Sequence, residues 1–248
     1  MTKTKILVKN LNMSYGSNVV MRDLSFDIKR GEIFLIIGRS GCGKSTLLKH
    51  MIGLKKTTRQ KIFYDGEDIN SAMNDGDFYG KKIGVLFQSG ALWSSMTLAE
   101  NVALPIGEHT NFNKQEIDDL ASLKLSLVGL HGFENFYPSQ ISGGMRKRAG
   151  LARAIALDPE VLFFDEPAAG LDPISAKHLD DLIIELSESL GITVVAVTHE
   201  LASIFAIGTR AIYLDIETKT ATAIGAPKEL LAHSNDKNVL AFMSRCTK

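Results

Sequence analysis

Residues 38–45 of this 248-residue chain are GRSGCGKS: a glycine, four other residues, then Gly-Lys-Ser. The apolar run EIFLIIG, residues 32–38, leads into this segment, and the helical pattern KSTLLKHMIGL begins at Lys44. A glycine-rich turn between a buried strand and a helix suits a bound phosphate, because glycines let backbone N–H groups turn inward and the helix start adds positive potential. The pattern predicts a phosphate loop and favours an α/β fold.

Two side chains of this loop are expected to have different roles. Lys44 is expected to neutralise the outer phosphates, and Ser45 is expected to ligate Mg²⁺. A glycine-rich turn with an exposed lysine is the alternative interpretation. The residues predicted to contact nucleotide here are Gly38, Arg39, Ser40, Gly41, Cys42, Gly43, Lys44, Ser45 and Thr46.

Hydrophobic periodicity extends the prediction to the rest of the fold. Residues 5–15 and 19–28 alternate apolar and polar side chains, as half-buried antiparallel strands do. Continuous apolar runs within residues 81–87, 161–166 and 192–200 indicate strands that are covered on both faces. Strands of this kind, separated by helical segments, predict a mainly parallel core sheet with an antiparallel β subdomain at the N-terminal end.

The β signal disappears between Thr97 and Leu157, where residues 113–130 have helical spacing and a stop at Gly129. We therefore expect one domain over residues 1–248. Its α/β core comprises about 1–96 and 158–248, and a helical subdomain is inserted at about 97–157. After the run ending at residue 200 the sequence predicts a helix, two short strands near residues 210–223, and terminal helices.

Composition excludes several classes of protein. Lys+Arg and Asp+Glu balance at 28 each, so no net charge favours binding to nucleic acid. No apolar run reaches the 18 or so residues of a membrane span, and the first ten residues, MTKTKILVKN, lack the apolar core of a secretory signal. A cytosolic location is expected, with Cys42 and Cys246 as reduced thiols.

An acidic pair ends one of the buried runs, in VLFFDEP, residues 161–167. Side chains alternate along a strand, so Asp165 and Glu166 should serve different tasks. Asp165 suits the Mg²⁺ shell, and Glu166 suits polarising an attacking water. The alternative is an N-terminal cap of the following helix.

A second candidate phosphate site lies in ISGGMRKRAG, residues 141–150. Ser142, Gly143 and Gly144 precede a helix rich in arginine and lysine, and a helix start attracts phosphate by its backbone N–H groups and dipole. Two such helix starts in one chain mean either that it binds two nucleotides or that each chain completes the site of another.

The order of GRSGCGKS, Gln88, ISGGM, VLFFDEP, AGLD and VTHE resembles the nucleotide-binding subunit of ATP-binding cassette (ABC) transporters, over nearly the whole chain. The resemblance implies a P-loop NTPase cassette that works as a homodimer. Two chains close head to tail on two ATP molecules, each held between the phosphate loop of one chain and residues 142–144 of the other.

The resemblance also assigns roles to single residues. Tyr15 would stack on adenine, Gln88 would reach Mg²⁺ and the attacking water, and His199 would sense the γ-phosphate and position Glu166. Leu171 and Asp172 would communicate across the dimer. On residue type alone Tyr15 is more often a half-buried strand residue, and His199 a surface residue. Ile141 and Met145 replace the Leu and Gln at the two ends of the usual Leu-Ser-Gly-Gly-Gln pattern, and we expect activity to survive.

The segment VLFQSGALWSSMTLAENV, residues 85–102, contains the chain's one tryptophan. In ABC importers the residues after this glutamine line a groove for a helix of the membrane permease, so residues 88–96 are expected to dock one. Apolar anchors suit such a groove, Trp above all. The alternative is that Leu92, Trp93 and Met96 pack inside the helical subdomain.

The sequence LFQSGALWSSMTLAENVALPIGEHT, residues 86–110, together with SGGM and GLDP, resembles that of Mla-type cassettes of MCE-associated phospholipid transport systems. That resemblance implies a peripheral ATPase on the cytoplasmic face of the inner membrane, with ATP, Mg²⁺, a permease and an MCE-domain protein as partners. The C-terminal end is expected to be too short for a long extension that grips another subunit. Amino-acid importer cassettes are the nearest alternative. A soluble ABC switch on nucleic acid is disfavoured by the single copy of each motif and the neutral charge.

Overall fold

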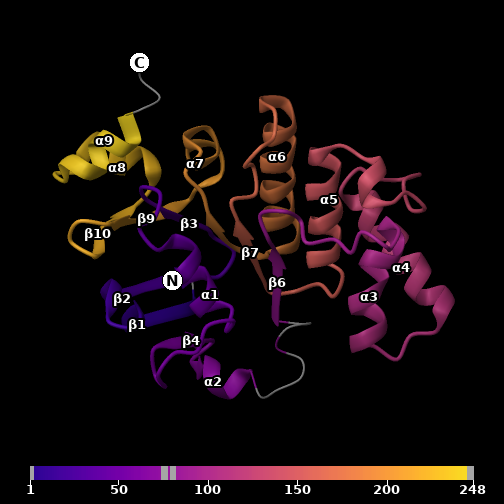
Figure 1. Cartoon of the computed structure of the whole chain (residues 1–248), viewed down its shortest axis with the longest axis horizontal. Helices are drawn as coiled ribbons and strands as arrows, with labels where there is room; N and C mark the ends of the chain where they lie inside the picture. Colours follow the sequence, from indigo (N-terminus) through magenta and orange to yellow (C-terminus); the bar gives the residue numbers. More distant parts are fainter. Residues whose placement is uncertain (1–2, 74–77, 79–81, 245–248) are drawn as a thin grey trace.

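The computed structural model describes residues 3–73, 78 and 82–244. Cys246 lies outside the described residues. Figure 1 shows an α/β body with the N-terminal strands at one side and three helices, α3 to α5, gathered at the other. No helix of the described part has both the length and the apolar character needed to cross a bilayer.

The N-terminal segment forms an antiparallel sheet, as its alternating pattern predicts. The central pair is β1 against β2, and β1 also pairs with β4, which pairs with β5. Two of these strands are too short to have been expected from sequence. In the order in which they lie in the sheet, the strands are β2 (Asn18–Lys29), β1 (Thr4–Tyr15), β4 (Ile62–Tyr64) and β5 (Glu67–Asp68).

A six-stranded core sheet confirms the predicted mainly parallel arrangement. Only β10 runs antiparallel, to β9 at the sheet's edge, and the other pairings are parallel. Every residue of β3 and β8 is buried, because both faces of the sheet are covered. The order is β10 (Thr220–Gly225), β9 (Arg210–Asp215), β3 (Ile33–Ile37), β8 (Thr193–Val197), β7 (Val161–Asp165) and β6 (Ile83–Leu86).

Helices fill the connections, and residues 87–160, all of them described, contain no strand. Thr97 and Asn113 begin two of these helices with capping boxes, in which Glu100 and Glu116 return the bond. The helices are α1 (Lys44–Met51), α2 (Ile69–Ala72), α3 (Leu98–His109), α4 (Lys114–Leu127), α5 (Gly143–Ala154), α6 (Pro173–Leu190), α7 (Leu201–Ile207), α8 (Pro227–His233) and α9 (Lys237–Met243).

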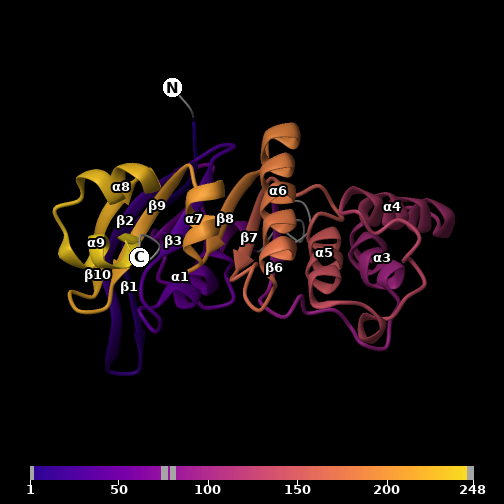
Figure 2. The same cartoon turned by 90° about the horizontal axis from the view of Figure 1, so that it is seen from above.

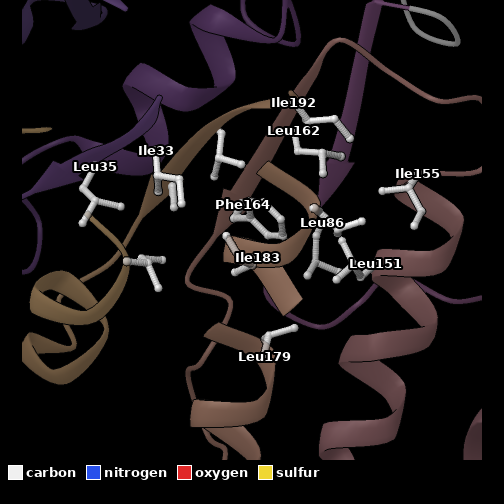
Figure 3. Close-up of a cluster of buried hydrophobic side chains, with 14 of the residues drawn as sticks. Ile33, Leu35, Leu86, Leu151, Ile155, Leu162, Phe164, Leu179, Ile183 and Ile192 are labelled. Carbon is white, nitrogen blue, oxygen red and sulfur yellow. The ribbon is translucent and has the colours of Figure 1, made fainter. Parts of the chain in front are cut away.

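Two hydrophobic clusters lie on opposite faces of the core sheet. Leu35 of β3 faces the cluster that includes α5, α6 and α7, whereas its neighbour Phe34 faces the cluster that includes α1 and the antiparallel sheet. Figure 3 shows the first cluster, with Phe164 between Ile183 of α6 and Leu86 of β6. Figure 2 shows the helices α3 to α5 set to one side of the sheet, beyond α6.

The parallel strands place the predicted site residues at one edge. The phosphate loop follows β3, the acidic pair ends β7, and His199 follows β8. These three strands are neighbours in the order β3, β8, β7, so their carboxyl ends open on the same crevice. Gln88 follows β6, the next strand in the sheet.

Candidate active site

Two glycines shape the phosphate loop. Gly38 has φ +148° and Gly43 has φ +105°, in the region that side chains rarely adopt. A Cβ at Gly38 would lie 2.5 Å from the backbone oxygen of Leu214, and one at Gly43 would lie 2.6 Å from Cγ1 of Val20. The loop therefore needs glycine at both positions, which explains the spacing in the sequence.

Lys44, the first residue of α1, is 7% exposed and folds back over the loop. Its Nζ donates to the carbonyl of Gly38 at 3.0 Å and to that of Arg39 at 3.2 Å. A buried ammonium on backbone carbonyls is poised to neutralise a phosphate that replaces them. The Cys42 side chain is buried in the core below, so only its backbone belongs to the loop surface.

Ser45 and Asp165 meet at the base of the loop, where Ser45 Oγ donates to Asp165 Oδ1 at 2.9 Å. Mg²⁺ prefers oxygen ligands and uses one or two carboxylates together with substrate phosphates. A hydroxyl and a carboxylate beside the phosphate loop fit that preference. The described residues contain no cluster of three or more His, Cys, Asp or Glu side chains, so the donor set is not that of an all-protein metal cage.

Glu166 and His199 form the second polar pair, with His199 Nδ1 2.8 Å from Glu166 Oε1. Glu166 has φ +52°, a left-handed conformation that turns it away from the strand containing Asp165. Its other oxygen, Oε2, is buried and has no hydrogen-bond partner in the described part of the chain. One oxygen is thus oriented by the imidazole, and the other is available to accept a proton.

Tyr15, at the end of β1, is 55% exposed. Its hydroxyl lies 3.3 Å from Thr46 Oγ1, and Lys55 Nζ sits 3.4 Å from the ring centroid. The hydrogen bond to Thr46 and the charge of Lys55 lower the pKa of the Tyr15 phenol. An exposed ring fixed at its hydroxyl and backed by a cation suits stacking on a planar base.

These residues surround a cavity of about 650 Å³. It brings together the predicted loop, the aromatic, Gln88, and the Glu166–His199 pair, while Asp165 reaches it only through Ser45. Val20, Leu201 and Phe242 also line it. No motif signals these three, because they come from segments that only the fold brings to the loop. The predicted residues in its wall are Tyr15, Gly38, Arg39, Ser40, Gly41, Gly43, Lys44, Ser45, Thr46, Gln88, Glu166 and His199.

Apart from Cys42 and Asp165, the predicted residues outside this wall form a second cluster that does not line the cavity. Ser142 caps α5 by accepting from Met145 N at 3.2 Å, and Asp172 caps α6 by accepting from the N–H groups of Ile174 and Ser175. Bonds from Ser175 lower the pKa of Asp172. A Cβ at Gly144 would lie 3.1 Å from Ser175 Oγ. Ser142, Gly143, Gly144 and Asp172 thus gather at two adjacent helix starts, away from the phosphate loop of their own chain.

The segment after Gln88 presents its tryptophan to solvent. Trp93 is 58% exposed, whereas Leu92 and Met96 are half-buried and Leu92 packs against the core. The docking interpretation therefore suits Trp93, which is available to a partner, and the packing interpretation suits Leu92. Arg153 binds the carbonyls of Gly90 and Ala91.

Two buried polar residues, Asn101 and Lys147, have contacts that the sequence did not predict. Asn101 is fully buried and bonds the backbone of Trp93, Met96 and Thr97. Lys147 on α5 is 6% exposed, and its Nζ donates to the Glu166 carbonyl at 3.3 Å. Burial lowers the pKa of Lys147, while Asp165 and Glu166 oppose that shift. Both lie inside segments whose sequence predicted a site, residues 85–102 and 141–150, but neither residue was assigned a role there.

A phosphate loop after the first core strand, a hydroxyl–carboxylate pair beside it and an aromatic at its rim define a nucleotide-binding protein of the P-loop class. The model of the ABC transporter family matches residues 21–169. The chain is 40% identical over 245 residues to the intermembrane phospholipid transport ATP-binding protein MlaF of Haemophilus influenzae, covering 98% of this chain and 91% of that protein. Its Escherichia coli counterpart is 38% identical, with 95% and 87% covered.

A third relative has a different name. The probable ribonucleotide transport ATP-binding protein mkl of Mycobacterium leprae is 45% identical over 197 residues, which cover 79% of this chain. The match spans only 57% of that protein.

Solved structures share the fold. The cassette MJ0796, solved as a dimer, has a TM-score of 0.80 and 30% identity, covering 89% of this chain and 98% of that one. The cbiO1 protein of Clostridium perfringens, part of an ABC transporter complex, has a TM-score of 0.82 and 26% identity, covering 98% of this chain and 95% of its own. The chain belongs to the ABC transporter family. The predicted cassette fold is confirmed.

Proposed function

We propose that this chain is the ATP-hydrolysing subunit of an ABC transporter that moves phospholipid between membranes. The observation that carries the enzymatic part is the Glu166–His199 pair, 2.8 Å apart, in the wall of the cavity that contains the phosphate loop. A carboxylate oriented by an imidazole beside a phosphate site is an arrangement for activating water.

In this proposal each residue has a defined task. Adenine stacks on Tyr15, and the loop N–H groups together with Lys44 hold the phosphates. The free Oε2 of Glu166 accepts a proton from the attacking water while His199 holds Oε1 in place. Ser45, Asp165 and Gln88 would hold Mg²⁺, which when bound neutralises charge on the phosphates.

The second cluster is the reason to propose a homodimer. Ser142 and the adjacent glycines lie at a helix start that does not line the cavity around the phosphate loop of its own chain. Head-to-tail pairing would put that start against the γ-phosphate held by the other chain. The related MJ0796 cassette, solved as a dimer, supports this arrangement.

The phospholipid part of the proposal depends on the extent of the match to MlaF. The match to the Haemophilus protein covers at least nine-tenths of this chain and of that protein. We propose that residues 88–96 dock a membrane permease on the cytoplasmic face of the inner membrane, with Trp93 as the anchor. An MCE-domain protein would complete the complex.

A second candidate, transport of a polar solute, is favoured by the mycobacterial relative named for ribonucleotide transport. The phospholipid proposal is preferred because that match leaves a fifth of this chain and over two-fifths of the relative unaligned.

Copurification separates the two candidates. The full chain, with an affinity tag, is pulled from detergent-solubilised membranes and its partners are identified by mass spectrometry. A permease with an MCE-domain protein and bound phospholipid supports the proposal, whereas a periplasmic solute-binding protein contradicts it. Trp93→Ala should lose the permease and keep nucleotide binding. If Trp93→Ala changed stability alone, the docking proposal would fail.

A further inference from the structure

Lys147 is a lysine inside the protein beside the proposed hydrolytic carboxylate. It is 6% exposed, and its Nζ donates to the Glu166 carbonyl at 3.3 Å. An ammonium is costly to bury unless it is hydrogen-bonded or close to negative charge. Lys147 has both, because the carboxylates of Asp165 and Glu166 act on its charge.

The peptide groups on either side of the Glu166 Cα are both held. Its N–H donates to the Val197 carbonyl of β8 at 2.9 Å, and its carbonyl accepts from Lys147 Nζ and from the Ala169 N–H at 3.2 Å. Held by these bonds, the residue has φ +52°, a conformation that non-glycine residues keep only when their surroundings impose it. The direction of the Glu166 side chain toward His199 therefore depends on these bonds, of which the one from Lys147 is the contact with α5.

Helix α5 connects this contact to two other parts of the molecule. Ser142 caps its start, and Arg153 on its last turn binds the carbonyls of Gly90 and Ala91 in the segment after Gln88. Gly150 fits closely there, because a Cβ on it would lie 3.0 Å from the Gly90 carbonyl oxygen. One rigid helix thus touches the docking segment, the Ser142 cluster and Glu166.

We propose that Lys147 is a positioning residue that fixes the backbone of Glu166, so that the helix carrying Ser142 sets the geometry of the Glu166–His199 pair. This inference depends on the proposed function, in which Glu166 activates water. Lys147 touches no nucleotide in this arrangement and acts only through Glu166. Its removal should therefore slow hydrolysis without weakening nucleotide binding.

The test compares Lys147→Met, which removes the donor, with Lys147→Gln, which keeps an N–H donor. Steady-state phosphate release by the purified full chain gives kcat and KM, and titration with a fluorescent ATP analogue gives affinity. Lys147→Met should lower kcat at least about tenfold with KM and affinity within about twofold, since small misplacements of a catalytic group cost up to about 10²-fold. Lys147→Gln should recover part of the loss.

Lys124→Met is the matched control, since Lys124 is 4% exposed and its Nζ lies 2.5 Å from Asp158 Oδ1. It should lose stability and keep kcat. The imidazole ¹⁵N signal of His199 gives a readout that does not need hydrolysis: it should shift in Lys147→Met and not in Lys124→Met. An unshifted signal, a folded Lys147→Met enzyme at full kcat, or equal rates for Lys147→Gln and Lys147→Met would overturn the inference. Absence of hydrolysis in the parent chain would contradict the proposed function instead.

Discussion

Replacing Asn101 by leucine tests how the segment after Gln88 is held. The Asn101 Oδ1 accepts from Trp93 N at 2.7 Å, and its Nδ2 donates to the carbonyls of Trp93, Met96 and Thr97 at 3.1, 3.2 and 2.8 Å. An amide NH₂ has two protons, so these contacts amount to about three full hydrogen bonds. Each contributes about 1 kcal/mol net, so Asn101→Leu should lower the free energy of unfolding by about 3 kcal/mol.

Leucine has the same number of side-chain heavy atoms and the same branching at Cγ as asparagine but is larger, so the substitution leaves no cavity and the loss comes from the broken hydrogen bonds together with any overpacking. Urea unfolding gives the change, with an unchanged m-value as the sign that both variants unfold from the same native state. Asn111→Leu, at an exposed position, is the control and should stay within about 0.5 kcal/mol of the parent. Trp93 is the only tryptophan, so its fluorescence anisotropy should also fall in Asn101→Leu. A loss below about 1 kcal/mol with unchanged anisotropy would refute the argument.

Four further substitutions test single positions. Glu166→Gln should keep nucleotide affinity and lose hydrolysis roughly 10²- to 10⁴-fold in a phosphate-release assay, and near-parental turnover would contradict the role of Glu166. Gly84→Ala would put a Cβ 2.1 Å from the Ala154 carbonyl oxygen and should cost roughly 1–3 kcal/mol by urea unfolding. Gly107→Ala in α3, with only Ile117 nearby at 3.8 Å, should instead gain about 0.5–1 kcal/mol. The pKa of Asp172 is lowered from 3.8, so its capping contribution is present above that pH and is lost as pH falls below it. The stability difference between the parent and Asp172→Asn should therefore shrink as pH falls below 3.8, and a difference that stays constant there would contradict this role of the Asp172 carboxylate.

The sequence predicts those helices and strands whose burial produces a regular pattern of apolar residues. The run at β3 is apolar throughout because both faces of that strand are covered. Strands β4 and β5 were not predicted, because three and two residues are too short to show a period. β4 forms because β1 offers an edge, where Ile6 pairs with Tyr64 and Val8 with Ile62, and β5 then pairs with β4. The order of the core strands is likewise set by packing between distant segments and by no local signal.

The same distinction applies to the candidate site. Glycine spacing, the acidic pair and the Ser-Gly-Gly segment are local patterns, so they were available from sequence. Lys147 lies between two arginines of α5 and Asn101 in the middle of α3, and a polar residue on a helix usually faces solvent. Their burial depends on which element packs above them: β7 and its following turn for Lys147, and the segment at Trp93 for Asn101. A residue whose role comes from tertiary contact alone leaves no pattern in the chain.

The exposure of Trp93 and the burial of Asn101 belong to one arrangement. A large apolar ring in water would gain most from a partner, but a flexible segment would lose much of that gain in ordering. Here Asn101 and Arg153 already fix the backbone on both sides of the ring, from Gly90 to Thr97. A partner helix would therefore bind a tryptophan whose backbone is already ordered. The entropic cost of ordering this segment is incurred when the chain folds and does not weaken docking. Loss of Asn101 should accordingly weaken docking even though Asn101 is buried and cannot touch the partner.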